Sequence, residues 1–510
     1  MVTPKSSLLF PILLTIALLS LSTCHAHKEA TIRELRIAFK ENRVNSRQLV
    51  EFYLGEIKKL NSVLKGVLEV NPNALYEADR ADRERAANVP RSLAGLHGIP
   101  VLLKDSIATK DKLNTTSGSF ALLGSVVPRD AGIVSKLRKS GAIILGKATL
   151  SEWSNFRSLS APTGWSPRGG QGKNPYVLSA TPCGSSSGPA ISVAANMVAV
   201  SIGTETDGSI LCPASFNSVV GIKPTVGLTS RAGVIPVSPS LDTVEPICRT
   251  VSDAVYVLEA IVGLDYNDRD ATKKTSQYIP YGGYTQFLKL DGLKGKRIGV
   301  VRNPFFMFSN RSNLHQVFEN HLQTLRYKGA ILIDNLEIKG LNAIFNATAS
   351  GEAAVAIAEF KIAINAYLKS LITSPVRSLA DIITFNNKYS DLEKVKNFGQ
   401  EIFLAAEATN GIGDLEKAAI ANMARLTREG YETTMGENRL DAVVTPGADI
   451  SPVLAIGGFP AISVPAAYND KGVPVGICFS GLKGSEPTLI EISYGFEQAT
   501  NVRKMPTFLP

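Results

Sequence analysis

The chain has 510 residues, of which 44% are hydrophobic and 19% are charged, a balance that supports a large buried core and excludes a disordered protein. The formal net charge of +9 is spread along the chain without a Lys/Arg block interleaved with aromatic residues, which argues against nucleic acid as a partner. The length suits about three average domains or one large α/β unit.

The N-terminus has the layout of a secretory signal peptide. Lys5 precedes a charge-free apolar stretch over residues 6–23, and the small-x-small run CHA predicts cleavage after Ala26. A signal anchor is the alternative, but the stretch contains Pro11 and is shorter than the roughly 20 apolar residues that span a bilayer. We therefore expect residues 27–510 to enter the secretory pathway or leave the cell, with no membrane span after cleavage.

Four cysteines remain once the signal peptide is removed: Cys183, Cys212, Cys248 and Cys478. Their spacing matches no zinc-binding pattern, and they are too few for a disulfide framework in a chain of this size. Cys183 and Cys212 flank the Gly/Ser-rich segments described below, where we expect them to pack as small apolar residues rather than to bridge. The sequence does not determine whether any of the four forms a disulfide.

Three Asn-x-Ser/Thr sequons predict a glycoprotein. Asn310 and Asn346 are expected at the surface, where an oligosaccharide can be accommodated. Asn114 follows a core strand, and we expect its match to be accidental.

The section after the signal peptide is predicted to be helical, with a capping box formed by Thr31 and Glu34 and an apolar face over residues 49–60. From residue 98 onward, short apolar runs alternate with helical stretches. The predicted strands are 101–103, 143–145, 198–202, 298–301, 442–444, 461–464 and 475–479, with helices at 133–140 and 190–196. Fully apolar short strands separated by helices predict a sheet covered on both faces, and hence an α/β fold.

The positions of the histidines limit which catalytic mechanisms the chain can use. His27 lies at the new terminus, where order is least expected. His315 and His321 lie in a polar helical stretch and are expected to be ordinary exposed residues. No His, Cys and Asp residues share metal-ligand spacing, so neither a metal nor a cofactor is predicted.

The run GSSSG at residues 184–188 matches the G-x-S-x-G nucleophile elbow of α/β-hydrolases, but that motif requires an acid and then a histidine downstream. The only later histidines are the two helical ones, so the elbow lacks its base. A phosphate-binding loop also fails, because no Gly-Lys-Ser/Thr follows the glycines. Lysine is the recognised substitute for histidine as the base that activates a serine.

Lys104 closes the apolar run in GIPVLLKD, and Ser209 lies in a second Gly-flanked segment, GTETDGSI. Burial disfavours the charged form of a lysine, so Lys104 can be neutral at working pH. Taken singly, each segment is more often a plain strand end or turn. The three segments together, in this order, are far more specific.

The run from about Gly98 to Ser252 resembles the amidase-signature family through GIPVLLKD, NTTSGS, PCGSSSGPA, GTETDGSILCPA and GIKPTVGLTSRAGVIP. The stretches LDAVVTP, GGFPAISVPA and GVPVGICFSG are similar to that family's closing strands, and the chain looks closest to the peptide-amidase branch and its plant relatives. The resemblance implies a mixed, twisted β-sheet with helices on both faces. It also implies one domain over 27–510, with a signature core at about 98–252, a largely helical elaboration at about 265–435 and closing strands at 440–482.

Carried over by position, the resemblance implies that Ser209 is the nucleophile, that Ser185 relays the proton from a cis peptide, and that Lys104 is the base. It implies an oxyanion hole formed by the backbone N–H groups of Thr206, Asp207, Gly208 and Ser209. It identifies no substrate-binding residue.

Two positions depart from the family pattern. Asp207 stands where the family more often has glycine, and a carboxylate there opposes a developing oxyanion unless it points away or is neutralised. Leu211 stands where the family often has arginine, which leaves the pocket floor less cationic and disfavours substrates with a free carboxylate near the scissile bond.

The leading hypothesis is an amidase that cleaves linear amide C–N bonds through an acyl-enzyme and releases ammonia or an amine. One alternative is an ammonia-transferring amidotransferase subunit, which needs a partner and a charged RNA and conflicts with a signal peptide. Another is a secreted binding protein that has lost catalysis, which the intact Lys104, Ser185 and Ser209 disfavour. The amide substrate and the oligomeric state cannot be predicted.

Overall fold

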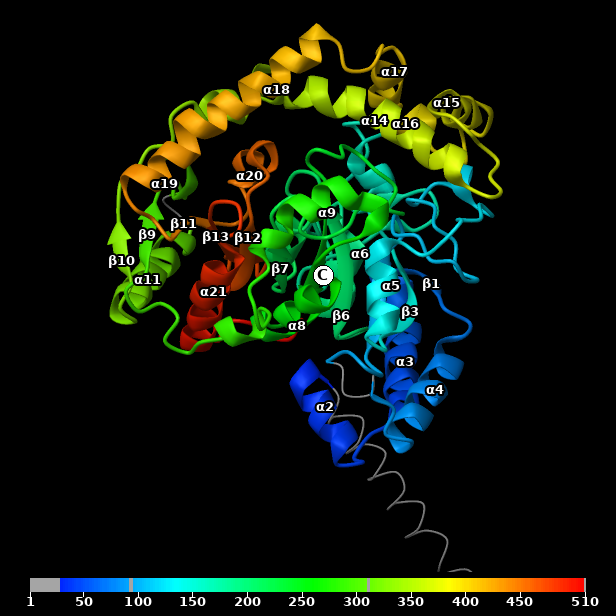
Figure 1. Ribbon diagram of the computed structural model, residues 1–510, viewed down its shortest axis with the longest axis horizontal. Coiled ribbons are helices and arrows are strands. Elements are labelled where there is room, and N and C mark those ends of the chain that lie inside the picture. The colour runs from blue at the N-terminus through cyan, green and yellow to red at the C-terminus, as the bar shows by residue number, and fades with distance from the viewer. Residues whose placement is uncertain (1–27, 91–94, 310–311, 509–510) are drawn as a thin grey trace, which may run out of the picture.

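The computed structural model describes residues 28–90, 95–309 and 312–508, so the predicted signal peptide and Asn310 lie outside the described residues. The described chain is built on an 11-stranded mixed sheet with the order β1-β3-β2-β6-β8-β7-β12-β13-β11-β9-β10 (Figure 1). These strands are β1 (Val67–Val70), β2 (Pro100–Lys104), β3 (Ile143–Ala148), β6 (Val200–Glu205), β7 (Val220–Lys223), β8 (Thr243–Cys248), β9 (Arg297–Val300), β10 (Ile331–Ile333), β11 (Ala442–Pro446), β12 (Ala461–Tyr468) and β13 (Pro474–Ser480). A separate pair joins β4 (Trp165–Ser166) to β5 (Gly170–Gln171).

The chain leaves β2 toward one edge of the sheet and then returns across β2 toward the other edge. This strand lies between β3 and β6 and runs parallel to both. Helix α5 (Gly132–Lys139) connects β2 to β3, and α6 (Ser187–Ala194) connects β3 back across β2 to β6. Because both crossovers are expected to be right-handed but run in opposite directions, α5 and α6 lie on opposite faces of the sheet. The carboxyl ends of β2 and β6 therefore meet at a topological switch point, the usual place for a ligand crevice in such sheets.

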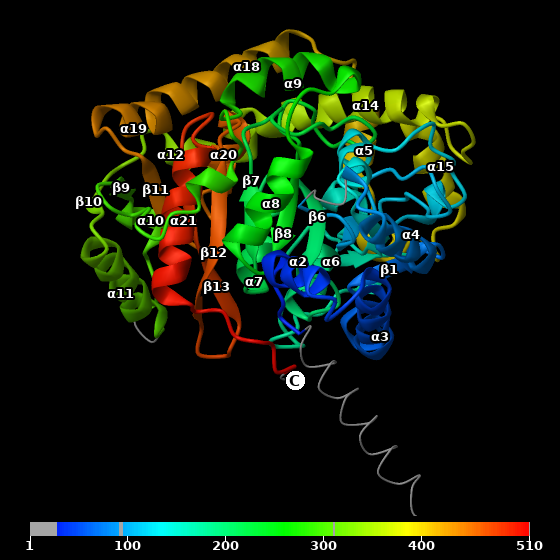
Figure 2. The same ribbon diagram turned by 60° about the horizontal axis from the view of Figure 1, so that its bottom comes forward.

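Further helices complete both layers. Helix α8 (Val251–Ile261) packs on β6, β7 and β8 and contacts α5, while α21 (Glu486–Thr500) continues this layer over β12 and β13 (Figure 2). Helix α7 (Leu211–Phe216) packs with α6 on the other face. Every residue of β2 and β3 is buried, as expected for central strands covered on both sides. The predicted α/β fold with a mixed, helix-covered sheet is confirmed.

The segment after the core carries a long helical arch. Helix α14 (Glu352–Ser370) and α18 (Asp414–Thr427) pack side by side across one end of the sheet (Figures 1 and 2). The other α-helices are α2 (Ile32–Lys40), α3 (Ser46–Leu64), α4 (Ala74–Ala86), α9 (Arg269–Thr275), α10 (Arg302–Phe305), α11 (Leu314–Tyr327), α12 (Leu341–Ile344), α13 (Ala347–Ser350), α15 (Leu379–Lys388), α16 (Val395–Phe398), α17 (Glu401–Glu407), α19 (Thr433–Glu437) and α20 (Ser451–Gly457). Of the helices in the described residues, none has the length and apolarity that a bilayer crossing requires.

One histidine differs from its prediction. His321 on α11 is buried, and its Nε2 lies 2.7 Å from the carbonyl oxygen of Ala466, so the expectation of an ordinary exposed residue is wrong. The reason is helical spacing, because His321 falls on the apolar face that also carries Phe318 and Leu325. His315 on the same helix is exposed, as predicted.

Candidate active site

Lys104 ends β2 inside the protein. Its side chain is fully buried, and Nζ lies 2.7 Å from Ser185 Oγ and 2.8 Å from Thr204 Oγ1. Burial lowers the pKa of this amine to about 7, although Glu245 and the other buried carboxyl groups around it oppose the shift. The amine is therefore substantially uncharged near neutral pH and can accept a proton from the hydroxyl that it contacts.

Ser185 is held at the start of α6 by the Gly/Ser turn. The Gly184–Ser185 peptide bond is cis, in agreement with the implied geometry. The N–H of Ser186 donates to the carbonyl of Ser209 at 3.1 Å, and Ser186 Oγ donates to the carbonyl of Thr204 at 2.9 Å. The turn that carries Ser185 is thus tied directly to the segment that carries Ser209.

Ser209 lies between β6 and α7, in a loop organised by Glu205. The Glu205 carboxylate accepts hydrogen bonds from the N–H groups of Ile210 at 2.7 Å and Leu211 at 2.9 Å, so it caps the start of α7. Gly208 adopts a positive φ of 72° and turns the chain immediately before Ser209. The sequence motif contains Glu205, but its role as the support of this loop was not predicted.

The loop also leaves backbone donors available. Across the described stretches of the chain, no acceptor engages the N–H groups of Thr206, Asp207 or Ser209. The N–H of Gly208, by contrast, faces the Glu205 carboxylate and lowers its pKa. Donors without partners next to a candidate nucleophile are suited to binding an oxyanion.

A pocket of about 720 Å³ opens over these loops, and both Ser185 and Ser209 line it. Its wall includes Asn155, whose Oδ1 is buried and has no hydrogen-bond partner among the described residues. Residues 153–155 all have positive φ angles, between 50° and 69°, which is costly for side chains larger than glycine. Strain of this kind beside an unpartnered amide oxygen makes Asn155 a candidate for contact with a substrate, and no sequence motif marks this residue.

The two departures from the family pattern lie in different surroundings. Asp207 lines the pocket, and burial raises its pKa to about 6, while a hydrogen bond from Ser451 favours its charged form. Asp207 therefore does not point away from the pocket. Leu211 is fully buried and is not part of the pocket wall, and within residues 28–90, 95–309 and 312–508 no lysine or arginine lines the pocket.

The two flanking cysteines form a disulfide, so the expectation that they pack without bridging is wrong. Cys183 and Cys212 have Cα atoms 5.9 Å apart, and both line the pocket. The bridge arises because the turn before Ser185 and the helix after Ser209 converge here, a proximity that spacing along the chain does not reveal. Cys248 and Cys478 are buried free thiols.

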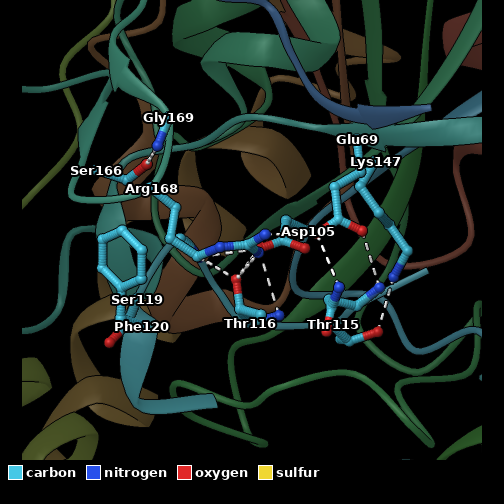
Figure 3. Close-up of polar contacts among 12 residues, drawn as sticks. Glu69, Asp105, Thr115, Thr116, Ser119, Phe120, Lys147, Ser166, Arg168 and Gly169 are labelled. Atoms are coloured by element: carbon cyan, nitrogen blue, oxygen red, sulfur yellow. Dashed lines mark hydrogen bonds and ion pairs between the residues drawn. The ribbon is translucent and has the colours of Figure 1, made fainter. Parts of the chain in front are cut away.

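A second buried lysine lies on the neighbouring strand (Figure 3). Lys147 of β3 is fully buried, and Nζ donates to the carbonyl of Ile107 and to Thr115 Oγ1, both at 2.7 Å. Burial lowers its pKa to about 8, while Asp105 opposes the shift. Asp105 in turn accepts from the N–H of Gly118 at 2.9 Å. This closed polar network is not part of the pocket wall.

The network extends to the sequon at Asn114. Its amide donates to Glu69 at 3.0 Å, and Glu69 also pairs with Arg168 (Figure 3). A side chain committed to these contacts is poorly placed to carry an oligosaccharide, in keeping with an accidental match. Asn346, by contrast, is exposed.

Comparison with known proteins identifies the class. The Amidase family model matches residues 48–456, so the chain belongs to the amidase family and is an amidase-type hydrolase. It is 60% identical to a probable amidase of Arabidopsis thaliana over 96% of this chain and 93% of that protein. It also matches the structure of the native peptide amidase from Stenotrophomonas maltophilia, with 41% identity, a TM-score of 0.89, and coverage of 94% of this chain and 99% of that one.

Proposed function

We propose that the chain cleaves linear carboxamides with Ser209 as nucleophile, Ser185 as proton relay and Lys104 as base. The observation that carries the proposal is the 2.7 Å contact between Lys104 Nζ and Ser185 Oγ, made by an amine whose pKa is about 7. Ser185 and Ser209 share one pocket wall, and hydrogen bonds join their loops. No histidine is needed for this arrangement.

The reaction follows from proton positions. Neutral Lys104 takes the proton of Ser185, Ser185 takes the proton of Ser209, and the Ser209 oxygen attacks the amide carbonyl. The oxyanion is bound by the free N–H groups of the nucleophile loop, each worth about 3 kcal/mol in the transition state. Ser185 then returns a proton to the leaving nitrogen as the C–N bond breaks. Water hydrolyses the resulting ester, giving a carboxylic acid and free Ser209.

Substitution and chemical labelling of Ser209 test the proposal. Ser209→Ala is expected to abolish ammonia release from a panel of amidated dipeptides, fatty amides and aryl acetamides, while its thermal unfolding stays that of the wild type. A fluorophosphonate is expected to label wild-type Ser209, as located by mass spectrometry. Ser187→Ala is the matched control, since Ser187 is buried at the start of α6 outside the pocket wall. Persistent hydrolysis by the Ser209 variant would remove the serine from its role.

An ammonia-transferring function is the second candidate. The chain is 31% identical to a glutamyl-tRNA(Gln) amidotransferase subunit of Thermoanaerobacter pseudethanolicus, over 93% of this chain and 97% of that protein. Glutamine-dependent ammonia transfer with candidate partner proteins tests it, and its absence alongside free amide hydrolysis excludes it. The binding-protein alternative receives no support from the relatives described above.

We also propose entry into the secretory pathway and glycosylation at Asn346. The signal-peptide pattern over residues 1–26 supports the first, and so does the Cys183–Cys212 bridge, because disulfides persist mainly in oxidising compartments. The exposure of Asn346 supports the second. N-terminal sequencing of the mature protein and a glycosidase mobility shift lost in Asn346→Gln test the two statements. A mature chain that begins at Met1 would contradict the first.

A further inference from the structure

Among the described residues, the charged side chains of the pocket all have the same sign. Asp207, Glu352 and Asp449 line it, and no lysine or arginine of the described ranges does. Asp207 comes from the nucleophile loop and Glu352 from the first turn of α14, so two distant parts of the chain bring carboxyl groups to one cavity. Asp449 is exposed, which leaves Asp207 and Glu352 as the enclosed pair.

Glu352 has no other evident role. Only 9% of its surface is exposed, and in the chain as described its carboxyl group makes no hydrogen bond or ion pair. Its oxygens are not among the fully buried atoms, so the carboxyl group is accessible from the pocket that it lines and is available to a ligand there. Asp207 accepts a hydrogen bond from Ser451, but its Oδ1 is buried and unpartnered.

The two carboxyl groups interact with each other. Burial and the nearby charge of Asp207 raise the pKa of Glu352 to about 8, whereas that of Asp207 is about 6. Behind Asp207, the buried Glu205 raises its pKa and the buried Lys223 lowers it. Near pH 7 the pair therefore carries about one negative charge and holds one proton, which a bound cation would displace.

The chemistry of the pair selects its occupant. An anion is repelled, and a neutral group cannot compensate the charge. A metal ion does not fit, because nowhere in the described residues do three His, Cys, Asp or Glu side chains gather as ligands. The pocket also presents the rings of Phe305 and Phe345, with centroids 5.9 Å apart, and such rings accommodate an alkyl stem or an ammonium group.

We propose that Asp207 and Glu352 form a recognition site for a protonated amine on the substrate, so that the preferred substrates are amides bearing an ammonium group. This inference rests on the proposed amidase reaction and adds a substrate class to it. Glu352 is a specificity-determining residue, contributed by the helical arch rather than by the core. The amine approaches the pair while the amide carbonyl lies at Ser209.

A homologous series tests the distance and the charge together. The substrates are ω-ammonio-alkanamides with one to six methylene groups, each compared with the alkanamide of equal length that ends in methyl. The wild type is expected to show a ratio of kcat/KM, ammonium over methyl, that peaks at one chain length and reaches roughly tenfold, the factor expected of a charge-assisted hydrogen bond. A ratio at or below one at every length would overturn the proposal.

Glu352→Gln is expected to lower that peak ratio about tenfold. General damage lowers both members of a pair and leaves the ratio unchanged, so a purely structural role predicts no change. Glu437→Gln is the control. Glu437 is exposed on α19, so this substitution removes the same charge outside the pocket. An equal ratio in wild type and Glu352→Gln would refute the role of Glu352.

For the members with four to six methylene groups, whose ammonium group has a pKa of about 10 and stays protonated, the ratio should also rise between pH 7 and pH 9, as Glu352 loses its proton. Titration of Lys104 affects both members of a pair alike and cancels. If neither series is hydrolysed, the proposed amidase function fails. The amine-recognition site is then tested separately, by measuring ligand binding. Calorimetry with Ser209→Ala should then show hexylamine binding more tightly than hexanol, an advantage that a further Glu352→Gln change reduces about tenfold. No advantage for hexylamine would reject the site.

Discussion

Lys104 and Lys147 lie on adjacent strands and share burial and a lowered pKa, yet their surroundings differ. Lys147 donates to Ile107 and to Thr115, close to Asp105 (Figure 3), and none of these residues lines the pocket. Lys104 contacts a hydroxyl that lines the pocket. A perturbed pKa alone therefore does not mark a catalytic group. In the proposed mechanism, contact with the hydroxyl of Ser185 distinguishes Lys104 from Lys147, and each prediction below tests that difference.

Loss of Lys104 should have the largest effect. Lys104→Met keeps much of the side-chain volume but removes the base, so kcat/KM is expected to fall at least about 10³-fold. Amide hydrolysis by steady-state kinetics measures this, with thermal unfolding as the folding control. Activity within tenfold of wild type would mean that Lys104, like Lys147, is not the catalytic base.

The pH dependence should give the next largest effect. Because Lys104 acts in its neutral form and its pKa is about 7, kcat/KM is expected to rise about a hundredfold from pH 5 to pH 8 and then level off. Lys147→Met should leave the midpoint of this rise in place. An optimum near pH 5 would contradict the base role of Lys104.

Opening the disulfide should have a smaller effect. Cys183→Ala with Cys212→Ala frees the turn of Ser185 from the helix after Ser209, and a misplaced relay is expected to lower kcat about tenfold. A reductant should reproduce the loss in the wild type and add nothing in the double variant. Cys248→Ala, which alters a buried free thiol, is the control. Full activity of the double variant would show that the hydrogen bonds between the loops suffice.

Loss of Lys147 should affect activity least. Lys147→Met leaves two oxygen acceptors without their donor and removes the positive charge that stabilises the buried Asp105 carboxylate, so the free energy of unfolding is expected to fall by about 3 kcal/mol. Values of kcat/KM should stay within about threefold of wild type at a temperature where the variant is folded. Denaturant unfolding and kinetics on one sample separate the two effects. A loss comparable to that of Lys104→Met would erase the distinction.

Much of the architecture could be predicted because its strands are short, apolar and fully buried. The predicted runs at 101–103, 143–145, 298–301 and 461–464 overlap β2, β3, β9 and β12. Strands β1, β7, β8 and β10 of the main sheet were missed. β8 carries Glu245 and Pro246, and β1 is only partly buried, so neither shows the apolar run that identifies a central strand.

The site divides in the same way. Lys104, Ser185 and Ser209 each belong to a short sequence motif, so these residues could be identified from the sequence. The remaining features arise from tertiary proximity: Cys183 meets Cys212, and Glu352 reaches Asp207 from another part of the chain. The sequence around Glu352, an alanine-rich helical stretch, shows only a helix with an acidic first turn. Its pocket function follows from how α14 crosses the sheet.

The carboxyl group of Asp207 in the pocket wall also affects product release. Hydrolysis converts an uncharged amide into a carboxylate within the pocket that Asp207 lines, and Asp207 is largely ionised above pH 6. Like charges repel more strongly where water is scarce. We therefore expect the acid product to bind more weakly than the amide, which favours rapid clearance of the site after each turnover.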